Sequence, residues 1–273
     1  MTSRWTRFAA LLALPLAVSF SARAQNSAAM PKSGAAPKSA VPAANAPFSP
    51  RDIFGVWNSR IPTNASQEEI IAYVSQFGKG NPPMTAWAQP KYDASKPSFG
   101  PRSVLLAQTN DPVYKCYPPG VPRVYLHPFP FEFVDGKKEI LQIFEYDHMV
   151  RHIFMDGRPV PTDPELTWLG YSVGHWDGDT LVVETVGFND KTWLDRVGHP
   201  HSDKMKVTER FTRTDGRTLK VDLHIEDPVA YKAPIDSTLF FTLHPDWDIM
   251  EQVCMDNISF EHFEDGGKTA EKK

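Results

Sequence analysis

Four Asp-Gly pairs, each between two stretches of alternating apolar and polar residues, constrain the fold of this chain more than any other feature. They are Asp135-Gly136, Asp156-Gly157, Asp177-Gly178 and Asp215-Gly216. Tight hairpin turns need residues that accept a positive φ, and Asp-Gly supplies them, so each pair predicts a β-hairpin. Consecutive hairpins build an antiparallel meander.

The segments around these turns are predicted as strands, and a short strand at Ile53–Asn58 precedes them. Nine strands are expected from residue 129 onward: Phe129–Val134, Glu139–Tyr146, Met149–Met155, Leu169–Trp176, Thr180–Phe188, Met205–Thr214, Arg217–Glu226, Ser237–Leu243 and Ile249–Met255. A meander of this length can close on itself, which removes exposed sheet edges. We therefore predict an all-β fold in which the meander closes into a barrel, with a sandwich as the alternative.

The residues before the meander predict one short helix and a long cover. Ser66 and Glu69 have the spacing of a capping box, four apolar residues follow at helical spacing, and Gly78 stands where a C-terminal cap belongs. Residues 79–122 are rich in proline and lack periodicity. They predict a covering segment with one helical turn near residues 85–89.

The N-terminus predicts export. Arg4 and Arg7 precede the apolar run Phe8–Phe20, which is too short to span a membrane comfortably, and Ala22-Arg23-Ala24 is a small-x-small cleavage site. A Sec-type signal peptide cleaved after Ala24, and hence a periplasmic or secreted protein, is expected; a retained anchor is the alternative. The expected organisation is a signal peptide at 1–24, a disordered Ala/Pro-rich linker at 25–50, a single domain at 51–264 and a frayed tail at 265–273.

The charge balance argues against two classes of partner. Three of the 29 Lys and Arg residues lie in the predicted signal peptide, so the 26 in the mature chain face 33 Asp and Glu residues. A protein with a net negative charge is not expected to bind nucleic acid or an anionic membrane surface. No other stretch is apolar enough to span a bilayer.

Cys116 and Cys254 are the only cysteines. An even pair in an exported protein predicts a disulfide, and two separate buried thiols are the alternative. The pair lacks the C-x-x-C spacing of a zinc or redox motif.

Three groups of motifs carry a resemblance. They are Asn110-Asp111-Pro112 with Cys116 and Gly120-Val121-Pro122-Arg123; the run 151–158; and the run from Trp168 through Gly178-Asp179-Thr180, Trp193-Leu194-Asp195, His201-Ser202 and Glu209-Arg210-Phe211 to Asp227-Pro228. Together they resemble a large family of uncharacterised exported bacterial proteins of acidobacteria and proteobacteria, over about residues 52–257. The resemblance implies no established activity.

A shorter resemblance concerns the first strand. Gly55-Val56-Trp57, with Asp52 before it, is similar to the Gly-x-Trp opening of lipocalins. The resemblance implies a lipocalin-like β-barrel whose cup binds one small apolar molecule.

Glu209 interrupts an otherwise regular strand pattern. It falls on the same side as Met205, Val207 and Phe211, so the alternation directs its carboxylate inward. A buried carboxylate is costly unless it is paired, and Arg151 on another alternating segment is the natural partner. Glu209 is therefore either a functional carboxylate inside the cup or half of a structural ion pair.

Further candidates lie near the expected mouth of the barrel. His201, on the long loop at residues 189–203, is suited to proton transfer near neutral pH. Ser202 is not expected to be a nucleophile with His201 as its base, because neighbouring side chains on an extended chain point apart and no Gly-x-Ser-x-Gly elbow is present. The residues expected to contact a substrate are Trp193, Asp195, Glu145, Ser202 and Trp168.

The sequence gives no signature of a metal or a cofactor. His148, His152, His199 and His201 cluster, but without the spacing of a metal site. No dinucleotide fingerprint or phosphate loop is present. We therefore expect no metal and no cofactor.

These observations favour an enzyme that acts on a small hydrophobic or aromatic molecule by cofactor-free acid/base chemistry, as an isomerase, dehydratase or lyase. Glu209 or His201 would move the proton, and Arg151 would stabilise negative charge developing on oxygen. The alternative is a non-catalytic binding or carrier protein of the cell envelope. A third interpretation is a structural envelope protein without a cavity.

Overall fold

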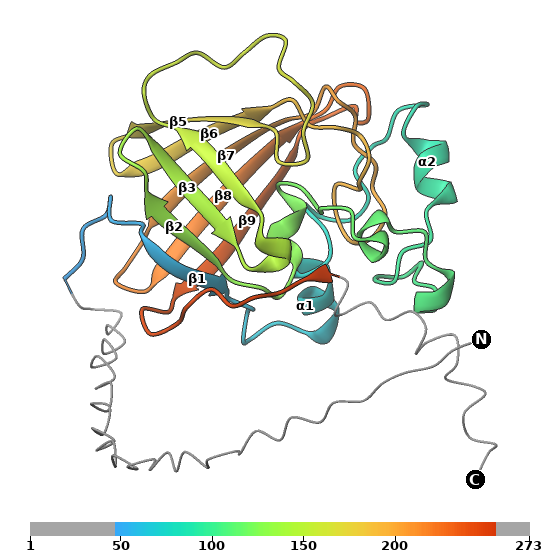
Figure 1. Cartoon of the computed structure of the whole chain (residues 1–273). Helices are drawn as coiled ribbons and strands as arrows, with labels where there is room; N and C mark the ends of the chain where they lie inside the picture. Colours follow the sequence, from blue (N-terminus) through green and yellow to red (C-terminus); the bar gives the residue numbers. More distant parts are fainter. Residues whose placement is uncertain (1–46, 255–273) are drawn as a thin grey trace, which may run out of the picture. The chain divides into compact units, whose positions relative to one another are not determined.

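The computed structural model describes residues 47–254. Within them, nine strands close into one barrel in sequence order (Figure 1). The strands are β1 Gly55–Ser59, β2 Phe131–Asp135, β3 Glu139–Phe144, β4 Val150–Phe154, β5 Tyr171–Asp177, β6 Thr180–Val186, β7 Lys206–Arg213, β8 Thr218–Glu226 and β9 Ile235–Leu243. The predicted all-β barrel is confirmed. The expected signal peptide, the linker up to residue 46 and the tail lie outside the described residues.

Three of the four Asp-Gly pairs make the predicted hairpins. Asp135-Gly136, Asp177-Gly178 and Asp215-Gly216 connect β2 to β3, β5 to β6 and β7 to β8, and all three strand pairs are antiparallel. Gly178 has a φ of +59°, which the turn requires and which most side chains resist.

The predicted hairpin at Asp156-Gly157 is wrong. β4 and β5 pair in parallel, with Ile153 opposite Ser172, and residues 155–170 cross over between them (Figure 1). Pro159, Pro161 and Pro164 follow the turn signal. Prolines cannot donate to a strand ladder, so the chain cannot return directly beside β4.

The last predicted strand is also wrong: residues 249–254 form no strand, and we name this segment the strap. The strap lies against the short 3₁₀ helix η4 (Tyr146–His148): the amide of Asp147 donates to Gln252 Oε1 at 2.6 Å, and the amide of Met250 donates to Glu145 Oε2 at 2.9 Å. β1 already occupies the free edge of β9, so the closed barrel has no edge left for a further strand.

The proline-rich cover at residues 79–122 is confirmed as largely non-repetitive, and short helices lie before, within and just after it. Helix α1 (Gln67–Tyr73) begins at the predicted capping box of Ser66 and Glu69 and ends before Gly78, with Val74 as its C-cap. Helix α2 (Gln89–Ala94) begins where the expected single turn ends. Three 3₁₀ turns follow: η1 Leu106–Gln108, η2 Pro112–Lys115 and η3 Arg123–Leu126. Figure 1 shows these segments gathered at one end of the barrel.

Backbone hydrogen bonds hold the cover, and the residues that follow α1, to the loops of that end. Thr85 donates to the carbonyl of Ala230 at 2.9 Å, and Arg196 on the β6–β7 loop donates to the carbonyl of Ser75 at 2.8 Å. The opposite end is closed differently. There Arg213 donates to the carbonyl oxygens of Asp52 and Gly216, and its guanidinium lies 5.8 Å from the ring centroid of Trp57.

Aromatic rings pack the middle of the barrel. Tyr125 and five phenylalanines are buried there and contact one another with centroid separations of 5.0 to 6.0 Å: Phe131, Phe133, Phe144, Phe211 and Phe241. Ring packing at these distances fills space that an open cup would leave to a ligand.

The predicted disulfide is confirmed. Cys116 in the cover and Cys254 in the strap are bonded, with their Cα atoms 5.5 Å apart and a sequence separation of 138. Such a bond favours a non-reducing compartment. Among the described residues, no helix is both long and apolar enough for a membrane crossing.

Candidate functional site

Glu209 points into the barrel, as its strand pattern predicts. It lies on β7 between Val207 and Phe211, and all three side chains have no exposed surface. Arg151 on β4, 1% exposed, is its partner. Arg151 Nη2 donates to Glu209 Oε2, and Nη1 donates to Oε1 at 3.1 Å. The Tyr125 hydroxyl donates to the same Oε1 at 2.7 Å.

The remaining hydrogen-bonding groups of Arg151 are also used. Its Nε donates to Ser172 Oγ at 2.9 Å, Nη2 to Thr185 Oγ1 at 2.6 Å, and Nη1 to Gln142 Oε1 at 3.0 Å. These partners lie on β5, β6 and β3. The network therefore ties together five strands, including the two that meet in the parallel β4–β5 pair.

The electrostatics of this network favour the charged pair. Burial is the largest single influence on Arg151 and opposes its charge, but the charge and hydrogen bonds of Glu209 and Tyr125 together outweigh burial and raise the pKa of Arg151. Burial, together with the same carboxylate, raises the pKa of Tyr125 well above its usual value, so the phenol stays a donor. A buried pair with all its partners satisfied has the geometry of a structural ion pair, one of the two interpretations left open above.

His201 and Ser202 lie elsewhere, on the β6–β7 loop. His201 Nδ1 is 3.2 Å from the carbonyl oxygen of Ser202, and burial lowers the pKa of His201. Ser202 donates to Asp227 through both its hydroxyl, at 2.7 Å, and its amide, at 2.6 Å. The structure shows no hydrogen bond within residues 47–254 that joins His201 to the Arg151–Glu209 pair.

Asp195 and Trp193 are on the same loop. Asp195 is buried and accepts from the amides of Val197 and His199, and its Oδ2 lies 2.5 Å from His199 Nδ1. It holds the loop in shape. The half-buried Trp193 ring lies 5.7 Å from the guanidinium of Arg123.

Glu145 and Trp168 are also separate from the buried pair. Glu145 accepts the amide of Met250 in the strap. Trp168 packs on Tyr117, with ring centroids 5.3 Å apart, and lines a surface groove beside the β4–β5 pair. The substrate-contact residues predicted from sequence thus do not converge on one place.

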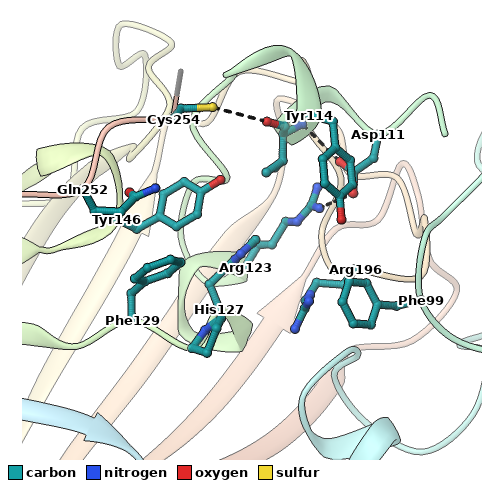
Figure 2. A pocket seen from close by; sticks show the side chains of 12 residues that line it. Phe99, Asp111, Tyr114, Arg123, His127, Phe129, Tyr146, Arg196, Gln252 and Cys254 are labelled. Atoms are coloured by element: carbon teal, nitrogen blue, oxygen red, sulfur yellow. Dashed lines mark hydrogen bonds and ion pairs between the residues drawn. The ribbon is translucent and has the colours of Figure 1, made fainter. Parts of the chain in front are cut away.

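A cavity that the sequence did not predict lies at the covered end of the barrel (Figure 2). Its volume is about 210 Å³. η2, η3, η4, the β6–β7 loop and the strap all contribute to its wall: Phe99, Asp111, Val113, Tyr114, Arg123, His127, Pro128, Phe129, Tyr146, Arg196, Gln252 and Cys254. The only sequence signal was that the first group of motifs, above, includes Asp111 and Arg123; no role was assigned to either.

Arg123 and His127 are buried beside this cavity. Arg123 Nη2 lies 2.5 Å from Asp111 Oδ2. Two buried nitrogens, Arg123 Nε and His127 Nε2, have no hydrogen-bond partner within residues 47–254. Burial, reinforced by Arg123 and Arg196, lowers the pKa of His127 well below its usual value, so the imidazole is neutral.

Arg196 supplies a second cation. Its guanidinium lies 3.5 Å from the ring centroid of Phe99, and its Nη1 donates to the carbonyl oxygens of Val74 and Leu126 at 3.1 and 3.0 Å. No ion pair is formed with Arg196 in the part of the chain that the structure describes. Burial lowers the pKa of Arg196 to about 10, so it is still charged at neutral pH.

Comparisons with known proteins add no assignment. A scan against protein-family models, a search of curated proteins and a search of solved structures each found no match. Within residues 47–254, no three His, Cys, Asp or Glu side chains are grouped to hold a metal ion. The two resemblances stay predictions.

Proposed function

We propose that this protein is an exported binding protein that takes one small organic molecule into the cavity beside Arg123 and Arg196. The observation that carries the proposal is the make-up of that cavity. Four aromatic rings, a buried histidine and a guanidinium without an acidic partner surround one space of about 210 Å³. Concave sites that combine apolar walls with a few placed polar groups are typical of ligand pockets.

The size of the cavity limits its ligand. Drug-sized ligands occupy pockets of about 300–1,000 Å³, whereas an apolar cavity of about 150 Å³ admits benzene. A space of about 210 Å³ therefore suits one ring with a small substituent. This agrees with the small hydrophobic or aromatic molecule expected from sequence.

The hydrogen bonds and positions of the predicted acid and base favour a binding function over a catalytic one. Both oxygens of Glu209 are engaged by Arg151 and Tyr125, and His201 belongs to another cluster. Cofactor-free lyase or isomerase chemistry with Glu209, His201 and Arg151 stays a prediction. The carrier alternative needs none of those groups to be free.

The proposed location is the periplasm or the exterior of the cell. The N-terminal signal pattern and the disulfide between Cys116 and Cys254 support it. The net charge of the mature chain supports a small-molecule partner in preference to nucleic acid.

Native mass spectrometry of the mature protein, purified from its own host and then exposed to a set of one-ring organic compounds, tests the proposal. We expect one small molecule per chain and a raised melting temperature. Pro128→Trp places a bulky ring at the exposed rim of the cavity and should abolish both effects. The matched control is Pro62→Trp at an exposed proline outside the cavity, which should retain them. Equal binding of the small molecule by both variants would show that it does not occupy this cavity.

A further inference from the structure

The charges around the cavity do not cancel. Arg123 and Asp111 form a buried ion pair and neutralise one another. Arg196 forms no ion pair within residues 47–254, and His127 is neutral. The wall therefore carries one uncompensated positive charge, which favours an occupant with a single negative charge.

Arg196 is placed to receive a carboxylate. One of its terminal nitrogens, Nη1, is already bound to two carbonyl oxygens, while its Nε and Nη2 make no hydrogen bond to the described residues. Nε and Nη2 form an edge of the guanidinium that matches the two oxygens of a carboxylate. The stacking on Phe99 holds the guanidinium plane in position before a ligand arrives.

The other side of the cavity is aromatic. Figure 2 shows Phe129 and Tyr146 on one side and Arg196 with Phe99 on the other. The rings of Phe129 and Tyr146 meet edge to face, with centroids 5.3 Å apart, and Tyr146 also contacts the ring of His127 at 4.7 Å. A planar ring offers such walls both an edge and a face.

Buried Arg123 Nε and His127 Nε2 have no hydrogen-bond partner in the described part of the chain. Packing voids in native proteins are apolar, and an unsatisfied buried polar group calls for a polar occupant or a functional role. The cavity thus has apolar walls and, beside them, two buried nitrogens without a hydrogen-bond partner among the described residues.

On the basis of the proposed function, we infer that the ligand is an aromatic monocarboxylate. Its carboxylate binds the Nε–Nη2 edge of Arg196, and its ring lies against Phe129 and Tyr146. A divalent inorganic anion would leave the aromatic wall without a partner. A neutral ring would leave Arg196 uncompensated.

Isothermal titration calorimetry with benzoate and benzamide tests the inference, since the two share a ring and a shape and differ in charge. We expect the wild-type protein to bind benzoate at least tenfold more tightly than benzamide. Arg196→Met should weaken benzoate binding at least tenfold and leave benzamide binding unchanged, which also shows that the variant retains a folded cavity. Lys191→Met removes an exposed cation from the same loop and is the matched control, with wild-type affinity for both.

The outcomes separate the ligand class from the proposed function. Equal affinity of the wild type for benzoate and benzamide, or unchanged benzoate affinity in Arg196→Met, overturns the carboxylate assignment while the cavity keeps its binding role. Acetate binding as tightly as benzoate overturns the aromatic part. No binding of any one-ring compound, charged or neutral, overturns the proposed function itself.

Discussion

Arg151 on β4 and Glu209 on β7 meet in the interior of the barrel through two parallel hydrogen bonds, although they are 58 positions apart in sequence. β4 and β5 are paired at only two residue positions, Ile153–Ser172 and Phe154–Val173. Arg151 adds side-chain bonds across this weak point, to Ser172 and to Thr185 beyond it. The ion pair thus strengthens the barrel where the backbone ladder is shortest.

Substitution of Glu209 by glutamine should strongly destabilise the protein. The change leaves the charge of Arg151 buried without a counter-charge, and losing one partner of a buried pair costs about 3–5 kcal/mol. Urea unfolding followed by tryptophan fluorescence measures the loss. Glu132→Gln, at an outward-facing position on β2, is the control and should stay within about 0.5 kcal/mol of the wild type.

A different result would revive the catalytic interpretation. If Glu209→Gln unfolds at the wild-type urea concentration but loses turnover of a bound molecule, then Glu209 serves chemistry and its pairing with Arg151 is secondary. A strand-wide loss of protection in hydrogen exchange across β4 and β5 would instead support the structural role.

The sequence predicted the barrel because its information was local and periodic. Alternation along residues 205–214 directed Glu209 inward, and three Asp-Gly turns gave their strand pairs correctly. The fourth turn signal failed because the three prolines that follow Asp156-Gly157 outweigh it. The strap at residues 249–254 has strand-like residues, but closure of the barrel by β1 and β9 is a long-range event that no local pattern encodes.

The cavity could not be predicted for a related reason. Arg123 lies on a 3₁₀ turn and Arg196 on a long loop, and neither segment has a period that reveals which side chains face inward. The two arginines are 73 positions apart and line one cavity only because the cover docks on the barrel. Strand alternation therefore reveals the buried pair of Arg151 and Glu209 but carries no information about the cavity.

The disulfide should contribute substantially to stability. It joins Cys116 and Cys254 across a sequence separation of 138, and removal of a bond that constrains so long a loop costs about 3–5 kcal/mol. Urea unfolding of Cys116→Ala/Cys254→Ala beside the oxidised wild type measures the difference. The reduced wild type should match the double variant. A loss below about 1 kcal/mol would show that the strap is held by its other contacts, such as the bond from Asp147 to Gln252.

Asp195 should be essential to the shape of the β6–β7 loop that carries Arg196. Asp195→Asn weakens the bonds to His199 and to the amide of Val197, and bonds to a charged acceptor contribute about 1.5–3 kcal/mol. Hydrogen exchange should then speed up at Val197 and His199. Asp203→Asn is the control, since this exposed carboxylate only pairs with Lys204 at the surface. Unchanged exchange in Asp195→Asn would show that packing alone fixes the loop.

Acid should destabilise the protein through His127. Burial, then the charges of Arg123 and Arg196, holds the pKa of folded His127 well below the value of about 6.5 expected in the unfolded chain. Below about pH 6.5 the unfolded state therefore binds a proton that the folded state refuses, so stability is complete above that pH and falls as the pH drops toward the folded pKa. One such group gives a slope of up to about 1.4 kcal/mol per pH unit.

Urea unfolding between about pH 7.5 and about pH 5 should show this slope in the wild type and in His175→Gln, an exposed control, and a shallower slope in His127→Gln. The buried His201, whose pKa is also lowered, keeps part of the slope in the variant. Identical slopes in the wild type and His127→Gln would contradict this prediction. They would show that the folded protein protonates His127 as readily as the unfolded chain does, despite the two neighbouring guanidinium groups.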